Sequence, residues 1–158
     1  MATTEKKSEI SESETKKILQ QLYAGSTVGE IIGFESEEFD ALYAIGHAHF
    51  MQANFTEALK FFQYLLFFNH FDRRAAIGAA CCFSELRNFE EALKHFGIAL
   101  MLDQNDPMIV IQIAKTLLIS GKKEEARTVI ASLKSEYKNT ADFKKIEIEI
   151  DQLDEFIN

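Results

Sequence analysis

Small and apolar residues recur with a spacing of 34 positions through the middle of the chain, from Phe39 to Lys138. Within each period the apolar residues also follow helical spacing, so each period contains two amphipathic helices. Small residues let two antiparallel helices approach closely, and a bulky residue one turn on fills the space beside them. Three sets of positions keep the step in phase: Gly46, Ala80 and Ala114; Ala58, Ala92 and Ala126; Phe62, Phe96 and Ile130. The pattern predicts three helical pairs, over 39–72, 73–106 and 107–140.

Helix-start signals follow the same period. Ser36 is expected to be the N-cap of the first helix. Asn54 with Glu57, and Asn88 with Glu91 one period later, predict the starts of second helices in two of the pairs. A 34-residue period that contains two helices is that of the tetratricopeptide repeat, or TPR. The sequence therefore predicts an all-α fold, a TPR-like α-solenoid of three helix-turn-helix repeats within residues 36–140.

The segment before the repeats divides into two parts. Residues 1–13 are rich in Ser, Thr, Glu and Lys and are expected to be disordered. Residues 14–35 predict a helical segment, with one helix over 14–24 and a short helical turn that a capping box at Thr27 and Glu30 opens and Gly33 ends.

The segment after the repeats, residues 141–158, carries two overlapping patterns. Three isoleucines alternate with polar residues as they would in a strand, at Ile146, Ile148 and Ile150. A second set is spaced three and four positions apart, as on one face of a helix: Phe143, Ile146, Ile150, Leu153 and Ile157. Because a solenoid needs an end cap with one polar face, a C-terminal capping helix is expected.

Composition narrows the possible partners. The chain has 158 residues, is 47% hydrophobic and carries a formal net charge of −8. An acidic surface repels phosphate backbones and anionic lipids, so neither nucleic acid nor a membrane is expected as a partner. The N-terminus lacks the apolar stretch of a signal peptide, and no stretch approaches about 18 apolar residues, as a membrane span needs. Adjacent cysteines, Cys81 and Cys82, can hardly form an unstrained disulfide, which fits a reducing cytoplasm.

The first helix of each TPR lines the concave side of the stack, so groove positions should also recur every 34 residues. Four columns meet this condition: Asp40, Arg74 and Met108; Tyr43, Ile77 and Ile111; His47, Cys81 and Lys115; Phe50, Ser84 and Leu118. All but Met108 are candidate contacts. Only Arg74 and Lys115 could bind a carboxylate, so the columns predict a groove for an extended apolar segment. The alternative is that Tyr43 and Phe50 pack against the N-terminal segment.

The run from Leu42 to Pro107 resembles the class II chaperones of bacterial type III secretion, the SycD/LcrH type. Matching motifs are Leu42-Tyr43, Phe62-x-x-Leu65, the run from Gly78 to Cys81, and the run from Ala99 to Asp103. Two turn positions depart from the family pattern, because Ala53 and Arg87 stand where glycine is usual. The resemblance covers residues 14–133 and is weakest in the third repeat.

The resemblance implies a specific function. Such proteins hold the two hydrophobic translocator subunits of the needle apparatus in the bacterial cytoplasm until export, and they are not enzymes. A short client segment lies extended in the concave groove. The positions that correspond to the family's groove are Tyr43, His47, Phe50, Arg74, Ile77 and Cys81.

The family also often forms homodimers through its N-terminal helical segment. Five apolar residues of this segment need a partner surface: Ile18, Leu19, Leu22, Ile31 and Ile32. A second copy of the chain would supply that surface, but so would the first repeat if the segment folded back onto it. Both arrangements remain open at this point.

Other chemistry finds little support in the sequence. His47 and His49 lie about 200° apart around a helix and cannot bind one metal ion together, and no other spacing predicts a metal or cofactor site. Two further hypotheses remain beside the chaperone. One is a generic TPR scaffold or regulator that binds a folded partner or a peptide C-terminus, and the other, ranked last, is an enzyme with a cysteine nucleophile.

Overall fold

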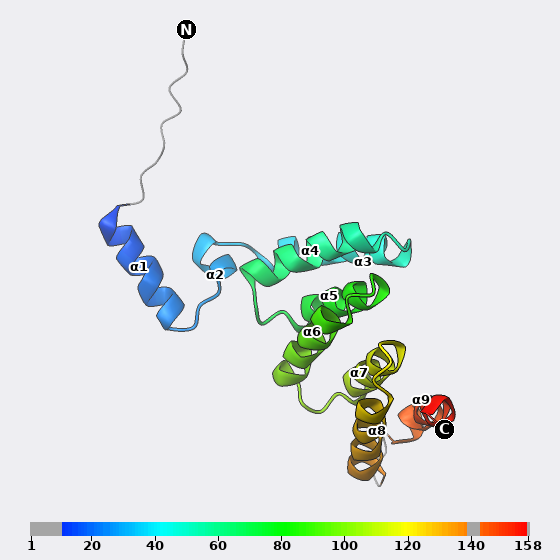
Figure 1. Cartoon of the computed structure of the whole chain (residues 1–158). Coiled ribbons are helices and arrows are strands. Elements are labelled where there is room, and N and C mark those ends of the chain that lie inside the picture. The colour runs from blue at the N-terminus through cyan, green and yellow to red at the C-terminus, as the bar shows by residue number, and fades with distance from the viewer. Residues whose placement is uncertain (1–10, 139–142, 158) are drawn as a thin grey trace.

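The computed structural model describes residues 11–138 and 143–157, without the side chains of Phe143 and Lys145. Every regular element in these ranges is a helix (Figure 1). The helices are α1 (Glu12–Tyr23), α2 (Val28–Ile32), α3 (Ser36–Met51), α4 (Phe55–Phe68), α5 (Arg73–Glu85), α6 (Phe89–Leu102), α7 (Pro107–Ile119), α8 (Lys123–Tyr137) and α9 (Phe143–Ile157). The predicted all-α solenoid of three helix pairs, with helices before it and a capping helix after it, is confirmed. The strand-like alternation near the C-terminus does not produce a strand.

Two helix starts differ from the prediction. Helix α1 begins at Glu12, because the hydroxyl of Ser11 accepts a hydrogen bond from the Glu14 N–H at 3.2 Å and the Glu14 carboxylate accepts one from the Ser11 N–H at 2.8 Å. Residues 11–13 are therefore ordered, and residues 1–10 lie outside the described residues. Ser36 is the first residue of α3 rather than its cap. Glu35 is the N-cap, and its N–H donates to the Glu38 carboxylate at 2.9 Å.

The turns inside the three repeats share one conformation. Each contains one residue in the left-handed region: Ala53 (φ 59°), Arg87 (φ 61°) and Gly121 (φ 84°). The next N–H then donates back to the carbonyl five residues earlier, as from Asn54 to His49 at 2.9 Å. Ala53 and Arg87 thus adopt the conformation that favours glycine. The two departures from the family pattern keep the turn geometry.

Phe62 joins the first two repeats. Its side chain is 1% exposed and lies on α4, between a glycine on α3 and a glycine on α5. A Cβ atom on Gly46 would stand 3.3 Å from the Phe62 ring and 2.9 Å from the Cβ of Phe61. One on Gly78 would stand 2.7 Å from the ring. Helix α5 therefore approaches the Phe62 ring more closely than an alanine would allow, and α3 approaches Phe61 of the same helix almost as closely.

The closeness of this contact predicts opposite effects for two glycine-to-alanine changes. Gly78→Ala should lower the free energy of unfolding by about 1–3 kcal/mol, because the new methyl group pushes against the Phe62 ring. Gly97→Ala, in α6, should raise it by about 0.5–1 kcal/mol, because no neighbour lies within 4 Å and alanine favours helix. Urea denaturation of both variants measures the difference. Changes of the same sign would contradict the described packing.

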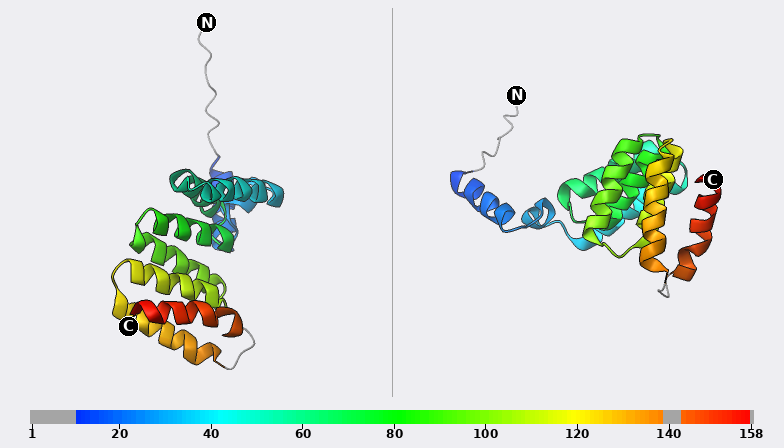
Figure 2. Two further views of the ribbon diagram at one scale, coloured as in Figure 1. Left: turned by 90° about the vertical axis from the view of Figure 1, so that its right-hand side faces the viewer. Right: turned by 60° about the horizontal axis from the view of Figure 1, so that its bottom comes forward.

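Helix α9 closes the C-terminal end of the stack. It lies along α7 and α8 (Figure 2) and buries Ile146, Ile150, Leu153 and Ile157 against them. The second core cluster of the molecule forms there, while the first surrounds Phe62 and Phe96. Residues 141, 142 and 158 of the predicted capping segment lie outside the described residues. In the part of the chain that the structure describes, no helix is long and apolar enough to cross a bilayer.

Candidate peptide-binding groove

The candidate groove residues lie on the first helix of each pair. Asp40, Tyr43, His47 and Phe50 are on α3; Arg74, Ile77, Cys81 and Ser84 are on α5; Ile111, Lys115 and Leu118 are on α7. These helices follow one another down the stack (Figure 2). The structure brings the residues of the first two repeats together on one face, but it treats the third repeat differently.

Arg74 connects the groove faces of the first two repeats. Its Nη1 donates to the Asp40 carboxylate at 2.9 Å, and its guanidinium carbon lies 4.9 Å from the centre of the Tyr43 ring. The carboxylate of Asp72, the N-cap of α5, lies 3.6 Å from its Nε. Three predicted groove residues therefore form one cluster in which the arginine charge is already compensated.

An apolar strip continues from this cluster. Tyr43 is half-buried and packs on Phe62, with ring centres 5.7 Å apart. Its burial raises the pKa of its hydroxyl above the ordinary value of 10.0, so the ring carries no charge near neutral pH. Ile77 and Cys81, both half-buried, contact the same core cluster. Each of these side chains keeps an exposed part, which gives an extended apolar segment a surface to cover.

His47 and Phe50 lie on the same face of α3 but have different surroundings. His47 is exposed, and its ring centre lies 6.2 Å from that of Tyr43, so it borders the strip. Phe50 packs edge-on against Phe55 with ring centres 5.3 Å apart, which makes it part of the contact between α3 and α4. The alternative, that Tyr43 and Phe50 pack against the N-terminal segment, does not describe this arrangement.

Ile111 was predicted wrongly as a groove residue. It is 0% exposed and belongs to the second core cluster, together with Ile146 and Ile150 of α9. Lys115 is half-buried, and its Nζ donates to the Glu149 carboxylate of α9 at 2.5 Å. The columns of the third repeat thus meet α9, because this helix packs along α7 at the end of the stack. Both cations that could bind a client carboxylate, Arg74 and Lys115, already have acidic partners.

Two residues of α9 that were not predicted as groove residues also line this side of the molecule. Leu153 and Phe156 line a pocket of about 570 Å³ together with Lys115 and Leu118. Phe156 is 74% exposed and falls outside the three-and-four spacing of the buried stripe. An exposed aromatic residue beside a regular stripe is the signal that could have indicated a second role for this helix.

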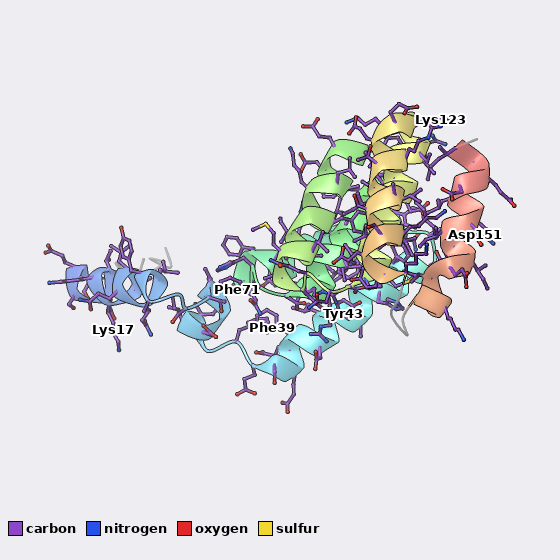
Figure 3. The ribbon with its side chains drawn as sticks, turned by 90° about the horizontal axis from the view of Figure 1, so that it is seen from below. Lys17, Phe39, Tyr43, Phe71, Lys123 and Asp151 are labelled. Carbon is purple, nitrogen blue, oxygen red and sulfur yellow. The ribbon has the colours of Figure 1, made fainter. Side chains whose placement is uncertain are left out.

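The N-terminal segment splits in two. Helix α2 packs on repeat one: Gly29 approaches the Phe39 ring, and the Phe34 ring lies 4.7 Å from that of Phe39 and 5.3 Å from that of Phe68. Helix α1 projects away from the repeats, with Lys17 far from the labelled residues of the body (Figure 3), and none of its residues is buried. The hypothesis that the N-terminal segment folds back onto the first repeat therefore holds for α2 but not for α1.

The candidate dimerisation residues follow this division. Leu19, Leu22 and Ile32 are 49%, 41% and 57% exposed, while Ile18 and Ile31 are half-buried. The outer face of repeat one, which no preceding repeat covers, has a pocket of about 600 Å³. Its apolar lining includes Phe34, Leu42, Phe61 and Tyr64.

Comparison with known proteins agrees with this architecture. Low calcium response locus protein H of Yersinia pestis is 21% identical over 136 residues, which cover 86% of this chain and 81% of that protein. Chaperone protein SicA of Salmonella typhimurium is 25% identical over 103 residues, covering 65% of this chain and 62% of that one. The chain is similar to type III secretion chaperones. No family model matches the sequence.

Solved structures show the same fold. A type III secretion complex from Aeromonas hydrophila has a TM-score of 0.79 at 22% identity, covering 90% of this chain and 95% of that one. SycD of Yersinia enterocolitica, in complex with a peptide of the translocator YopD, has a TM-score of 0.69 at 22% identity, covering 78% and 94%. PcrH in complex with the chaperone binding region of PopD has a TM-score of 0.70 at 22% identity, covering 79% and 94%. The resemblance to the SycD/LcrH type is thereby confirmed.

The two thiols lie in a packed helix. Cys82 is 0% exposed and Cys81 is half-buried. Burial raises the pKa of the Cys81 thiol to about 11 and that of the Cys82 thiol to about 12, from an ordinary value of 9.0. Since the thiolate is the nucleophile, both groups are poorly suited to attack near neutral pH. In the described part of the chain, no cluster of three His, Cys, Asp or Glu side chains is placed to hold a metal ion.

These raised pKa values predict how alkylation and stability depend on pH. At pH 8, iodoacetamide should modify Cys81 of the folded protein roughly 10- to 100-fold more slowly than in the unfolded chain, because a pKa two units higher leaves about 100-fold less thiolate, while the thiolate that remains is more nucleophilic. The stabilising contribution of the thiols is fully present below pH 9 and is lost as the pH rises from 9 toward 12, since the unfolded chain releases these protons first. Mass spectrometry and urea denaturation measure the two effects. Equal alkylation rates in both states would contradict the burial.

Proposed function

We propose that this protein is a cytoplasmic chaperone of a bacterial type III secretion system. It binds hydrophobic translocator subunits through its concave TPR groove and keeps them soluble and competent for export before secretion. It acts by covering apolar surface, without catalysis and without a cofactor. The observation that carries the proposal is the half-buried strip of Tyr43, Ile77 and Cys81 across the first two repeats. The fold shared with SycD and PcrH, whose solved complexes contain translocator segments, supports it.

The charges of the groove support an apolar client over a peptide C-terminus. A terminal carboxylate would have to compete with Asp40 for Arg74, or with Glu149 for Lys115. An apolar side chain displaces only water from the strip, and its burial is favourable in proportion to the area covered. The generic TPR scaffold is therefore the weaker hypothesis. A captured peptide whose binding is lost on amidation of its C-terminus would favour that scaffold instead.

Co-expression tests the proposal directly. The two translocators encoded beside the gene of this protein are produced in a heterologous bacterial host, with and without this protein. With it, we expect the translocators to move from the insoluble to the soluble fraction and to co-purify with it. Translocators that stay insoluble in its presence would contradict the proposed function.

We also propose that the protein forms a homodimer through α1. The exposed side chains of Leu19 and Leu22 need a covering surface, and the uncovered apolar pocket on the outer face of repeat one supplies one in a second copy. Leu19→Glu with Leu22→Glu should convert the dimer to the 18.0 kDa monomer, because the charges cannot be buried without partners. Gln20→Glu, an added charge on another side of α1, is the control. Size-exclusion chromatography with light scattering measures the mass, and a monomeric wild-type protein would refute the dimer.

A further inference from the structure

Helix α9 blocks one path along the groove and leaves another open. The row that contains Tyr43 and Ile77 cannot continue across the third repeat, because α9 covers Ile111 completely. The rows nearer the C-terminal end of α7 stay accessible. Lys115 and Leu118 of these rows line the pocket of about 570 Å³ between α7 and α9. A segment that follows the groove from repeat one would therefore reach this pocket last.

The wall formed by α9 is fixed in place. The Lys115 ammonium donates to Glu149 at 2.5 Å, Lys134 pairs with Asp154, and Nη2 of Arg127 donates to the carbonyl of Ile157 at 3.2 Å. Ile146 and Ile150 are 1% and 0% exposed beneath the helix. A client would have to break these contacts to displace α9, whereas the pocket beside it is already open.

The lining of the pocket indicates what it binds. Leu118, Ile119, Leu153 and Phe156 supply its apolar surface, and the charge of Lys115 is compensated by Glu149. Lys123, the first residue of α8, also lines the pocket, and Figure 3 shows this residue near α9. Apolar walls with a compensated charge favour an uncharged, bulky side chain, and the volume is in the range of about 300–1,000 Å³ that ligand pockets have.

We propose that the pocket between α7 and α9 is the end site of the groove, where it binds a bulky apolar side chain of the client segment. The inference rests on the proposed function and adds the route of the client. The segment lies across the first two repeats, turns toward the C-terminal end of α7 and anchors there. Continuity with the groove through Lys115 and Leu118 identifies the occupant as the same extended client segment.

Two substitutions on the same helix test the pocket. Phe156→Glu places a charge in it, and the 74% exposure of Phe156 means that the fold does not depend on its ring. Ile148→Glu adds the same charge to α9 at a position that is 69% exposed and does not line the pocket. The probes are fluorescein-labelled peptides with the YopD segment bound by SycD and the PopD region bound by PcrH, and fluorescence anisotropy measures their affinity for the full-length protein.

We expect Phe156→Glu to weaken binding at least about tenfold and Ile148→Glu to change it less than about twofold. As a second measurement, a photoreactive benzoylphenylalanine at position 156 should cross-link to the bound peptide, and one at position 148 should not. If Phe156→Glu binds as the wild type does while Ile77→Asp does not bind, the end site is wrong and the proposed function stands. If neither peptide binds the wild type and the translocators do not co-purify with it, the proposed function itself is wrong.

Discussion

Replacing Ile77 by aspartate should abolish the recovery of translocators with this protein. Ile77 lies half-buried on α5, in the same row as Tyr43 and beside the core cluster around Phe62. Burying an isoleucine side chain contributes about 1.5–3 kcal/mol, so Ile77→Ala alone should weaken client binding about tenfold. An aspartate adds the cost of removing a charge from water without a partner, and the total loss should exceed about 100-fold.

Affinity capture of co-expressed translocators, followed by anisotropy with labelled segments, measures this loss. The control is Ile98→Asp on α6, where the same residue type is 39% exposed and belongs to the second helix of its pair. Circular dichroism of each variant, during heating, shows whether helix content and melting temperature are retained. Client recovery that survives Ile77→Asp in a folded protein would mean that the client does not lie between the first two repeats.

Phe62→Ala should strongly destabilise the first two repeats. The ring is 1% exposed and lies where α3 and α5 approach α4 closely, at Gly46 and Gly78. The ring of Tyr43 packs against it. Truncating a buried phenylalanine typically lowers the free energy of unfolding by about 3–5 kcal/mol, since the transfer energy is lost and a cavity remains. The glycines make the cavity harder to fill, because neither carries a side chain that could move into it.

Urea denaturation monitored by circular dichroism measures this change. Phe67→Ala is the matched control on the same helix, where the ring is 67% exposed and a change within about 0.5 kcal/mol is expected. Client binding should fall together with stability in Phe62→Ala, since Tyr43 loses its support. A loss below about 1 kcal/mol would show that the two repeats do not depend on this ring.

Two ion pairs that follow the 34-residue period could have been predicted from the sequence but were not. Arg74 pairs with Asp40, and Lys115 pairs with Glu149; in both pairs the partners are one 34-residue period apart. Equivalent positions on successive first helices lie side by side, so opposite charges one period apart can meet. The residues of one column are therefore neighbours of one another as well as possible contacts for a client, and both cations already pair with a carboxylate of their own column.

What the sequence determined by itself is the repeat architecture. Helix starts depend on capping side chains within about four residues, and the helical faces depend on spacing within one period, so both can be inferred from local patterns. The left-handed turn residues follow the period as well, although Ala53 and Arg87 stand there in place of glycine.

Only the tertiary structure decided where the groove ends and which apolar faces stay uncovered. Ile111 occupies a groove column in the sequence, yet it is buried in a cluster with residues of α9, and no local pattern reports where a terminal helix packs. Helix α1 and helix α2 carry similar apolar residues, but α2 reaches Phe39 and Phe68 while α1 does not pack on the body. Burial depends on contacts between distant segments, and the free energy of those contacts is a property of the assembled fold.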